Sequence, residues 1–350
     1  MKLYSNEIVF RGHPDKVCDQ ISDAILDECL RQDKSSRCGI ETMGGKGKIF
    51  ITGEITTTAK INVKKIVKRV LKDIGYDTNY KIIDNIGKQS LDIALGTNDE
   101  VAGAGDNGMM FGYACLDTDK YLPTAMVILQ ELSESYDNLR QKDNRFKPDG
   151  KAQITGIYDD NNKLIKIKTF TICYQNTEEQ RNETDNIIKE ICNNICNKYN
   201  VVVEEYLVNP TGRFKIGGFE GDAGLTGRKI VVDSYQSFAN VGGGAFSGKD
   251  PTKVDRSGAY KAREIAKSVL KDNKEYNWCE VQLSYAIGKE KPLAIYIKTD
   301  KGNIDVPDKL YEECKPKNII NELDLKNICY EKKAMYGHFS DWYNKKMIYK

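Results

Sequence analysis

Short segments rich in glycine and charged side chains recur along the chain, and their residue types suit contact with a polyphosphate. They are GHPDK (12–16), GAGDNG (103–108), PDGK (148–151), NPTGRFKIGGFEGDAGLTGRK (209–229) and GGGAFSGKDPTKVDR (242–256). Lysine and arginine neutralise phosphate oxygens, carboxylates hold Mg²⁺, and glycine lets backbone N–H groups approach an anion. If the segments converge, they supply one site with His13, Asp15, Asp106, Lys151, Arg213, Asp222, Arg228, Lys229, Lys249, Lys253 and Asp255.

Two familiar nucleotide-binding patterns nearly match within these segments. Residues 103–108 satisfy GxGxxG, but they follow a polar stretch and lead into a strand-like run, whereas a dinucleotide fold needs a preceding strand and a following helix. Residues 243–249 have the GxxxxGK spacing of a phosphate loop, but Asp250 stands where Ser or Thr would bind Mg²⁺. The dinucleotide fold and the phosphate loop are therefore both disfavoured, although Lys249 is still expected to contact a phosphate.

The same residues also have structural interpretations. A lone histidine at a helix start is more often a cap, but the neighbouring Pro, Asp and Lys favour a functional role for His13. Asp15 alone could simply cap its helix, and His338 is expected to be structural. Lys249 and Lys253 could form a solvated helix face, but the interleaved aspartates behind a triple glycine favour a site.

These segments need a framework of helices and strands to position them. Apolar spacing after Pro14 predicts a helix whose N-terminus carries GHPDK. Further helices are expected at 62–74 and 254–270, and strands at 48–57, 109–114, 206–209 and 229–233. Residues 89–108 are expected to be a mobile loop, and 134–150 and 158–164 surface loops. The mixture of elements predicts an α+β fold.

Composition limits the class of protein. The 350 residues predict two or three domains, and 53 Lys and Arg against 51 Asp and Glu give a net charge of +2, without a general attraction to nucleic acid or anionic lipid. Neither a signal peptide nor a membrane span is recognisable, so we expect a soluble, cytoplasmic protein. The ten cysteines are expected to be free structural thiols. Cys192 and Cys196 could reach a metal together, but no third ligand is near.

The longest of these segments are specific enough to indicate a family. GHPDKVCDQISDAILD, GEITT, GAGDNGMMFGYA, NPTGRFKIGGFEGDAGLTGRKIVVDSY, GGGAFSGKDPTKVDRSGAY and YGHF follow one another over essentially the whole chain. In order and spacing the sequence resembles the methionine adenosyltransferases, also called S-adenosylmethionine synthetases.

The resemblance implies a fold, an assembly and a reaction. It implies an α+β protein of three similar βαββαβ domains about a pseudo-threefold axis, with domains at 1–100, 103–217 and 218–350. It implies a homodimer or homotetramer with shared active sites, and neither a nucleic-acid nor a membrane partner. ATP, L-methionine and water would give S-adenosylmethionine, phosphate and diphosphate, with two Mg²⁺ and one K⁺ per site.

Carried over motif by motif, the resemblance also implies roles for individual residues. The catalytic residues would be His13, Lys151, Arg228 and Lys249. ATP would be bound by His13, Asp106, Asp149, Lys151, Arg213, Phe214, Asp222, Arg228, Lys229, Ala245 and Lys249. Methionine would contact Glu54, Gln89, Asp222 and Lys253. Asp15 and Asp255 would hold Mg²⁺, and Glu41 would hold K⁺. Without the resemblance, Glu54 and Glu41 would pass for ordinary solvated strand residues.

The sequence departs from the family at a few positions. Phe10 and Arg11 replace small and acidic residues before GHPDK, Leu91 replaces a proline, and Val241 stands where histidine often precedes the triple glycine. The loop from 89 to 106 is also shorter than usual. Loop gating, substrate affinity and K⁺ dependence are the properties that these departures affect. Two alternatives remain from the sequence: a Mg²⁺-dependent phosphotransferase or phosphatase, and a non-catalytic nucleotide-binding homologue.

Overall fold

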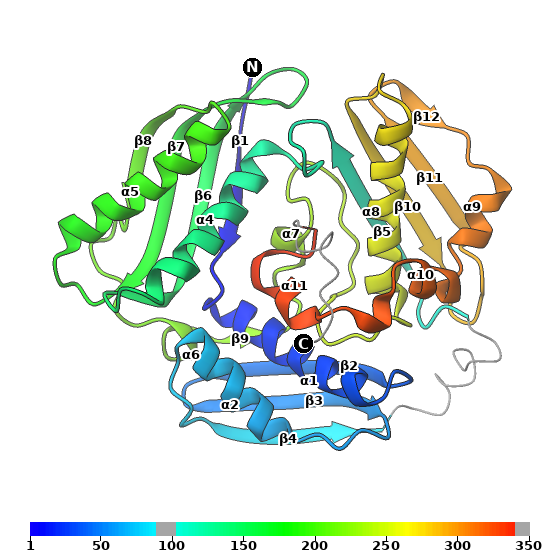
Figure 1. The fold of residues 1–350 in the computed structure, drawn as a ribbon, viewed down its shortest axis with the longest axis horizontal. Helices are drawn as coiled ribbons and strands as arrows, with labels where there is room; N and C mark the ends of the chain where they lie inside the picture. The colour runs from blue at the N-terminus through cyan, green and yellow to red at the C-terminus, as the bar shows by residue number, and fades with distance from the viewer. Residues whose placement is uncertain (89–102, 340–350) are drawn as a thin grey trace.

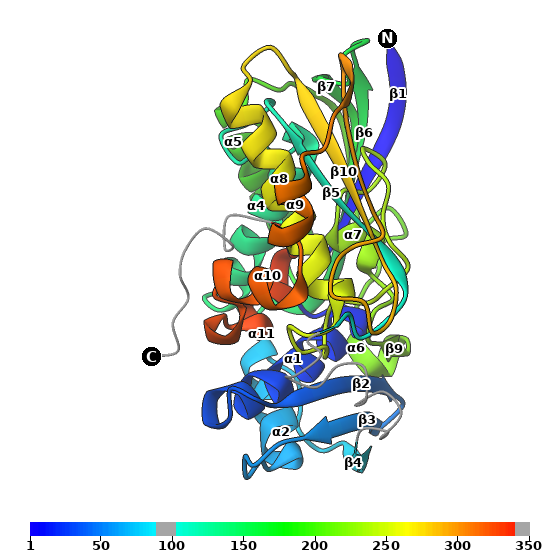
Figure 2. The same ribbon diagram turned by 90° about the vertical axis from the view of Figure 1, so that its right-hand side faces the viewer.

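Three four-stranded sheets, each covered by helices, make up the protein. The computed structural model describes residues 1–88 and 103–339. The sheets surround a central region that holds α7 and α11 (Figure 1). A quarter turn shows the strands gathered toward one side of the molecule and most helices toward the other (Figure 2).

The first sheet carries α1 and α2 on one face. Its strands in spatial order are β4 (Lys81–Gly87), β3 (Lys48–Thr56), β2 (Arg37–Gly45) and β9 (Gly224–Leu225). The helices are α1 (Pro14–Gln32) and α2 (Val63–Ile74), which pack on the side of the sheet that holds Cys38 and Ile40. Because side chains alternate along a strand, Gly39 and Glu41 face the opposite, open side.

The second sheet is formed by longer strands and lies beneath α4 and α5. Its strands in order are β1 (Lys2–Val9), β6 (Phe146–Tyr158), β7 (Leu164–Asn176) and β8 (Val203–Val208). The helices are α4 (Thr124–Arg140) and α5 (Arg181–Lys198). Ile154, Phe170 and Ile172 from the sheet share one apolar cluster with Leu129 and Ile188 from the helices.

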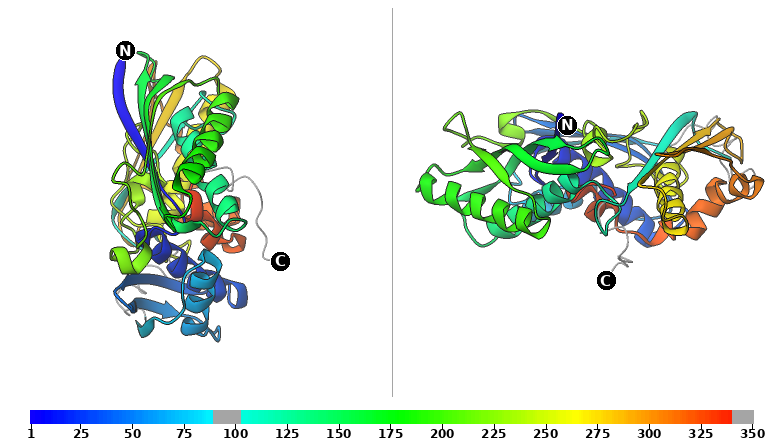
Figure 3. Two further views of the ribbon diagram at one scale, coloured as in Figure 1. Left: turned by 90° about the vertical axis from the view of Figure 1, so that its left-hand side faces the viewer. Right: turned by 90° about the horizontal axis from the view of Figure 1, so that it is seen from above.

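The third sheet packs against α8. Its strands in order are β12 (Gly302–Ile304), β11 (Ala294–Thr299), β10 (Trp278–Tyr285) and β5 (Gly108–Cys115). The helices near it are α8 (Val254–Asp272), α9 (Asp308–Glu313) and α10 (Pro316–Glu322). Seen from above, this unit and the second sheet with its helices lie at opposite ends of the molecule (Figure 3).

The three units exchange strands in a ring. Strand β1 joins the sheet of β6 to β8, β5 joins the sheet of β10 to β12, and β9 joins the sheet of β2 to β4. The element order is βαββαβ from β1 to β4 and again from β5 to β8. In the last third, short helices stand before and after β9; α8, β10 and β11 come next, followed by β12 and further helices. The fold is therefore the expected α+β architecture, while the boundaries at 1–100, 103–217 and 218–350 stay a prediction.

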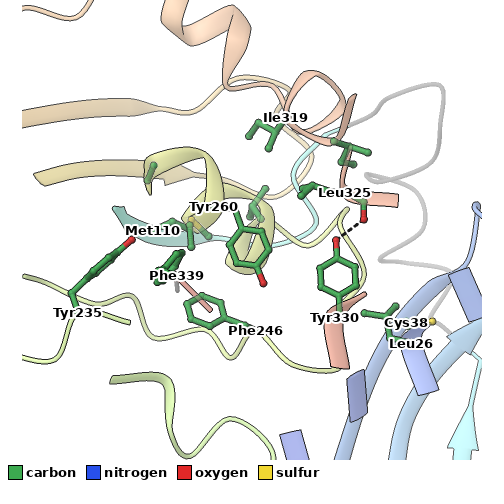
Figure 4. Packing of buried hydrophobic residues seen from close by; sticks show 14 of the residues in the cluster. Leu26, Cys38, Met110, Tyr235, Phe246, Tyr260, Ile319, Leu325, Tyr330 and Phe339 are labelled. Atoms are coloured by element: carbon green, nitrogen blue, oxygen red, sulfur yellow. Dashed lines mark hydrogen bonds between the residues drawn. The ribbon is translucent and has the colours of Figure 1, made fainter. Parts of the chain in front are cut away.

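The centre of the molecule is closed by short elements from the second half of the chain. These are α6 (Gly218–Gly221), α7 (Ile230–Asp233), the 3₁₀ helix η1 (Leu325–Asn327) and α11 (Tyr330–Tyr336). Aromatic side chains from this region pack together, and the Tyr330 hydroxyl donates to the Leu325 carbonyl at 2.6 Å (Figure 4). Because these rings fill the middle, the first and third units share one apolar core, whereas the second sheet and its helices enclose an apolar cluster of their own.

Several expected elements are confirmed and two are wrong. Helices at 62–74 and 254–270 and strands at 48–57 and 109–114 are found within one or two residues. Residues 229–233 are not a strand, because α7 forms there and the Asp233 N–H donates to the Lys229 carbonyl. Residues 134–150 are not one surface loop, since α4 runs to Arg140 and β6 begins at Phe146.

Two further features concern a pair of cysteines and the length of the helices. Cys192 and Cys196 are buried in the apolar cluster beneath α5, which fits their structural role. No helix in the described part of the chain is both long and apolar enough to cross a bilayer.

Candidate active site

His13 lies at the first turn of α1 and caps it. Its Nδ1 accepts the backbone N–H of Asp15 at 3.2 Å, and Pro14 occupies the first helical position. The preceding turn is held by the Tyr76 hydroxyl, which donates to the Gly12 carbonyl at 2.6 Å. The imidazole therefore sits at the positive end of a 19-residue helix, where negative charge is stabilised.

The His13 ring is neutral at physiological pH. Burial, followed by the positive charge of Lys229, lowers the pKa of His13 to about 4. Because Nδ1 accepts the backbone hydrogen bond, the proton of the neutral ring is on Nε2. His13 can thus donate a hydrogen bond from Nε2 to a ligand oxygen without carrying a full charge.

Asp15 gathers two cations beside His13. Its carboxylate is 1% exposed and accepts from Lys229 Nζ at 2.5 Å and Arg228 Nε at 2.8 Å, as well as from the Leu225 N–H. Burial opposes ionisation, but the hydrogen bonds from Lys229, Leu225 and Arg228 lower the pKa of Asp15. The carboxylate is therefore ionised, and it fixes both cations at the N-terminus of α1.

A cavity of about 310 Å³ opens next to this cluster. It is lined by His13, Pro14, Asp149, Gly150, Lys151, Cys173, Phe214, Ile216, Gly221 and Asp222. Asp149 accepts the Gly218 N–H at 2.8 Å, and burial raises its pKa to about 6. Five residues expected at the nucleotide thus line one hollow. We call this hollow, with Asp15, Arg228 and Lys229, the His13 cluster.

A second group of expected residues, which we call the Lys249 cluster, lies on the glycine-rich segment before α8. Lys249 Nζ pairs with Asp255, and the Asp255 carboxylate lies against Gly244. Lys253 Nζ pairs with the fully buried Asp250 at 2.5 Å. Ala245 lies against Gly227, where an added Cβ would come within 2.6 Å of it.

Glu54 and Glu41 lie on the open face of the first sheet. Glu54 is opposite Gly39 and Glu41 is opposite Thr52 in the β2–β3 register, so both glutamates share that face. Gly39 also forms a backbone bridge to Lys249. The structure therefore brings Glu54 near the Lys249 cluster, whereas Glu41 is exposed farther along β2.

The structure does not bring every expected residue to the site. Arg213 is 70% exposed and pairs with Glu178 at 2.8 Å. Asp106 is exposed and accepts the N–H of the next residue, Asn107. Gln89 and Leu91 lie outside the described residues, as does most of the expected mobile loop.

The two clusters are separated along α1. Asp15 anchors the His13 cluster, and Asp23 accepts the Gly248 N–H next to Lys249 at 2.8 Å. Eight residues at 1.5 Å rise place these carboxylates about 12 Å apart along the helix axis. The residues that the structure does bring together therefore form two neighbouring groups within one chain.

An acidic stripe on α1 was missed by the sequence reasoning. Asp15, Asp19, Asp23 and Asp27 recur every four residues, and each accepts backbone N–H groups from the C-terminal part of the chain. The donors, in the same order, are Leu225, Gly227, Gly248 and Tyr330. Their i, i+4 spacing in the sequence could have indicated this stripe, since four aspartates on the inner face of a helix need buried partners.

The residues that depart from the family before GHPDK also make buried contacts. The Phe10 ring stacks on Tyr136 with centroids 4.4 Å apart. Arg11 donates to Gln20 at 2.7 Å and pairs with Asp137 at 3.4 Å and with Asp73. Phe10 and Arg11 thus support the turn before His13 in this chain.

The carboxylates fit a metal that is bound mainly by its substrate. Among the residues that the structure describes, no group of three or more metal-ligating side chains comes together. Asp15 offers one carboxylate beside Lys229, and Asp255 offers one beside Lys249. This donor set suits Mg²⁺, which keeps waters and takes one or two carboxylates together with substrate phosphates.

The fold and this arrangement define a class: α+β proteins in which lysine and arginine side chains gather beside a cavity at the N-terminus of a helix. Comparison with known proteins specifies it further. Family models match for the S-adenosylmethionine synthetase N-terminal domain over residues 1–95, the central domain over 101–214 and the C-terminal domain over 216–347.

Curated relatives agree with the family models. An S-adenosylmethionine synthase of Clostridium tetani (strain Massachusetts / E88) is 42% identical over 373 residues, covering 97% of this chain and 94% of the relative. One of Nocardioides sp. (strain ATCC BAA-499 / JS614) is 41% identical over 371 residues, covering 97% and 93%. The chain belongs to the S-adenosylmethionine synthetase family.

Proposed function

We propose that this chain is a methionine adenosyltransferase that converts ATP, L-methionine and water to S-adenosylmethionine, phosphate and diphosphate. The chain's membership of the synthetase family over all three domains supports this proposal, and the residues to which we assign catalytic roles are present in its motifs. This membership favours a synthase over the two alternatives, a phosphotransferase or phosphatase and a non-catalytic homologue.

The chemistry is an in-line displacement at C5′ of ATP by the methionine sulfur. A thioether sulfur carries no proton, so the attack needs no general base. Negative charge grows on O5′ and on the departing triphosphate, where fixed hydrogen-bond donors and cations stabilise it. His13 donates from Nε2 to O5′, while Lys151, Arg228 and Lys249 neutralise phosphate oxygens. The triphosphate is then hydrolysed in the same cationic pocket.

The remaining contacts follow the family pattern. ATP lies against Asp149, Phe214, Asp222, Lys229 and Ala245. In the shared site it also lies against Asp106 and Arg213, which a single chain leaves exposed. Methionine lies against Glu54, Gln89, Asp222 and Lys253. The cavity lined by His13, Asp149 and Phe214 supports the nucleotide assignment. Positioning the sulfur in line with C5′ contributes several kcal/mol or more to the rate.

Metal ions complete the site. Asp15 and Asp255, together with the substrate's phosphates, would hold two Mg²⁺ per site, and Glu41 would hold one K⁺. When bound, Mg²⁺ neutralises charge on the phosphate oxygens. Asp15 already orients Arg228 and Lys229, so it places these two side chains for phosphate.

The active site is shared between two copies of the chain in a homodimer or homotetramer. The separation of the His13 and Lys249 clusters along α1 supports this proposal, because a ligand held by both needs them to face each other. In a twofold dimer, the His13 cluster of one copy faces the Lys249 cluster of the other.

Product analysis tests the proposed function. Purified protein is incubated with ATP, L-methionine, Mg²⁺ and K⁺, and the products are identified by mass spectrometry and phosphate assay. We expect S-adenosylmethionine with matching diphosphate and phosphate. Release of ADP would indicate the phosphotransferase or phosphatase, and unchanged ATP the non-catalytic homologue.

A further inference from the structure

A fully buried ion pair lies behind Lys249. Arg256 Nη2 donates to both carboxylate oxygens of Asp23, at 2.9 and 2.8 Å, and both side chains are completely shielded from solvent. A buried ion pair adds little stability over an apolar pair of similar size, because desolvation costs about as much as the attraction returns. Its presence therefore needs an explanation other than stability.

Each partner of the pair also holds the backbone next to Lys249. Asp23 Oδ1 accepts the Gly248 N–H at 2.8 Å, and Arg256 Nη1 donates to the Lys249 carbonyl at 3.0 Å. The pair thus grips the chain on both sides of the Lys249 Cα. The Lys249 ammonium remains on the outer side, where it pairs with Asp255.

The turn at Lys249 is fixed on its other side by β2. The Ile40 N–H donates to the Gly248 carbonyl at 3.1 Å. Gly248 has φ +83°, and a Cβ there would lie 1.9 Å from the Ile40 carbonyl oxygen, so only glycine fits. With both flanking peptide groups held, the backbone of Lys249 has a single position.

We propose that Asp23 and Arg256 are positioning residues, which set the place of the Lys249 ammonium against the triphosphate of ATP. This inference rests on the proposed function. Neither residue touches the substrate; both act through the backbone of Lys249. A shift of about 1 Å in a charged group at a reacting centre can lower the rate by about 10²-fold.

Arg256→Lys tests the proposal, because it keeps the positive charge beside Asp23 and removes the guanidinium group that bonds Asp23 and the Lys249 carbonyl together. One ammonium cannot match the planar fork that bonds both Asp23 oxygens and the Lys249 carbonyl. We expect kcat to fall by about 10- to 100-fold, with KM for methionine within about twofold. Asp23→Glu should lower kcat in the same way, and it replaces Arg256→Lys as the test if Arg256→Lys does not fold.

Arg263→Lys is the matched control. Arg263 lies two turns farther along α8, is also buried, and donates to the carbonyls of Tyr113, Tyr121 and Lys120, away from Lys249. This variant should lose a comparable amount of thermal stability and keep kcat within about twofold. If Arg256→Lys retains the kcat of Arg263→Lys, the positioning role is refuted.

A double-mutant cycle separates positioning from general damage. In a Lys249→Met background the Asp23–Arg256 pair has no ammonium to position. Arg256→Lys should therefore change kcat in that background by less than about twofold. If Arg256→Lys lowers kcat in the Lys249→Met background by as much as it does in the wild type, the proposal is overturned. If the wild type and Arg263→Lys form no S-adenosylmethionine, it is the proposed function that fails.

Discussion

His13 combines two roles at the start of α1. Its Nδ1 caps the helix by accepting the Asp15 N–H, which leaves the proton on Nε2 for a ligand. Burial and the nearby Lys229 keep the ring neutral. A neutral donor can strengthen its hydrogen bond as charge grows on the leaving oxygen, without having attracted the ground-state phosphates as a full cation.

Replacing His13 should therefore slow the reaction more than it weakens binding. We expect His13→Ala to lower kcat by at least about 10²-fold while inorganic triphosphate still binds, as measured by product formation and calorimetry. His13→Ser, which keeps a capping oxygen, should restore stability but not turnover. Turnover at the wild-type rate in either variant would rule out the catalytic role.

Histidine titration gives a second test at this scale. Burial lowers the pKa of both histidines of the chain, His13 to about 4 and His338 well below its usual value. The unfolded chain therefore binds more protons than the folded one between about pH 4 and 6.5. The histidine contribution to stability is present above about pH 6.5 and is lost as the pH falls toward 4. NMR of ¹⁵N-labelled histidine should show neither ring titrating between about pH 5.5 and 8; a ring with an ordinary midpoint would contradict this.

Residues within one contiguous motif could be predicted from the sequence. GHPDK indicated His13 and Asp15 together, because a helix start fixes their relative positions. Asp23 and Arg256 could not be found in this way, since they are 233 positions apart and meet only after folding. The pairing of Lys253 with the buried Asp250 was missed because a short glycine-rich segment gives no periodic signal.

At the level of elements, α1 organises the site. Its four aspartates hold the segments that carry Arg228, Lys249 and α11. Helix α1 itself is in turn tied to α2 and α4 by Arg11, which bonds Gln20 and pairs with Asp73 and Asp137.

Loss of Arg11 should therefore destabilise the protein. Arg11→Met leaves Gln20 and buried Asp137 with fewer partners, and we expect a loss of about 1.5–3 kcal/mol in the free energy of unfolding. Arg31→Met removes an exposed arginine paired with Glu28 and should cost less than about 1 kcal/mol. Denaturant unfolding measures both. If both variants lose the same free energy of unfolding, the buried contacts of Arg11 add no more stability than an exposed ion pair does.

The elements that were predicted wrongly share one cause. Residues 230–232 are β-branched and suggest a strand, but the Asp233 carboxylate binds the buried Lys16 at 2.7 Å and α7 forms there. The charged stretch from 134 suggested solvent, yet Asp137 is buried because two arginines pair with it. In both cases partners distant in the sequence override the local pattern.

At the scale of the whole molecule, the three units interlock by donating their first strands in a ring. This exchange could not be predicted from the sequence, because strand order depends on partners more than 100 residues away. It joins the units into one body, which holds the His13 and Lys249 clusters at a fixed separation. A fixed separation suits half-sites that are completed by a second copy.

Mixed dimers test whether the sites are shared. The His13→Ala and Lys249→Met variants are each expected to be nearly inactive. In a heterodimer of the two, purified with separate tags, one shared site carries both substitutions and the other carries neither. We expect about half of the wild-type kcat per dimer. A heterodimer as inactive as its parents would place each site within one chain.

In the proposed reaction, the methionine sulfur displaces the whole triphosphate from C5′ of ATP. A single-turnover experiment tests it most directly: excess protein is mixed with ATP labelled at the γ-phosphate, with methionine, Mg²⁺ and K⁺, and is quenched at increasing times. We predict S-adenosylmethionine and tripolyphosphate forming together, followed by diphosphate and phosphate, with no ADP or AMP at any time. Labelled phosphate appearing with ADP and without the sulfonium product would contradict the account.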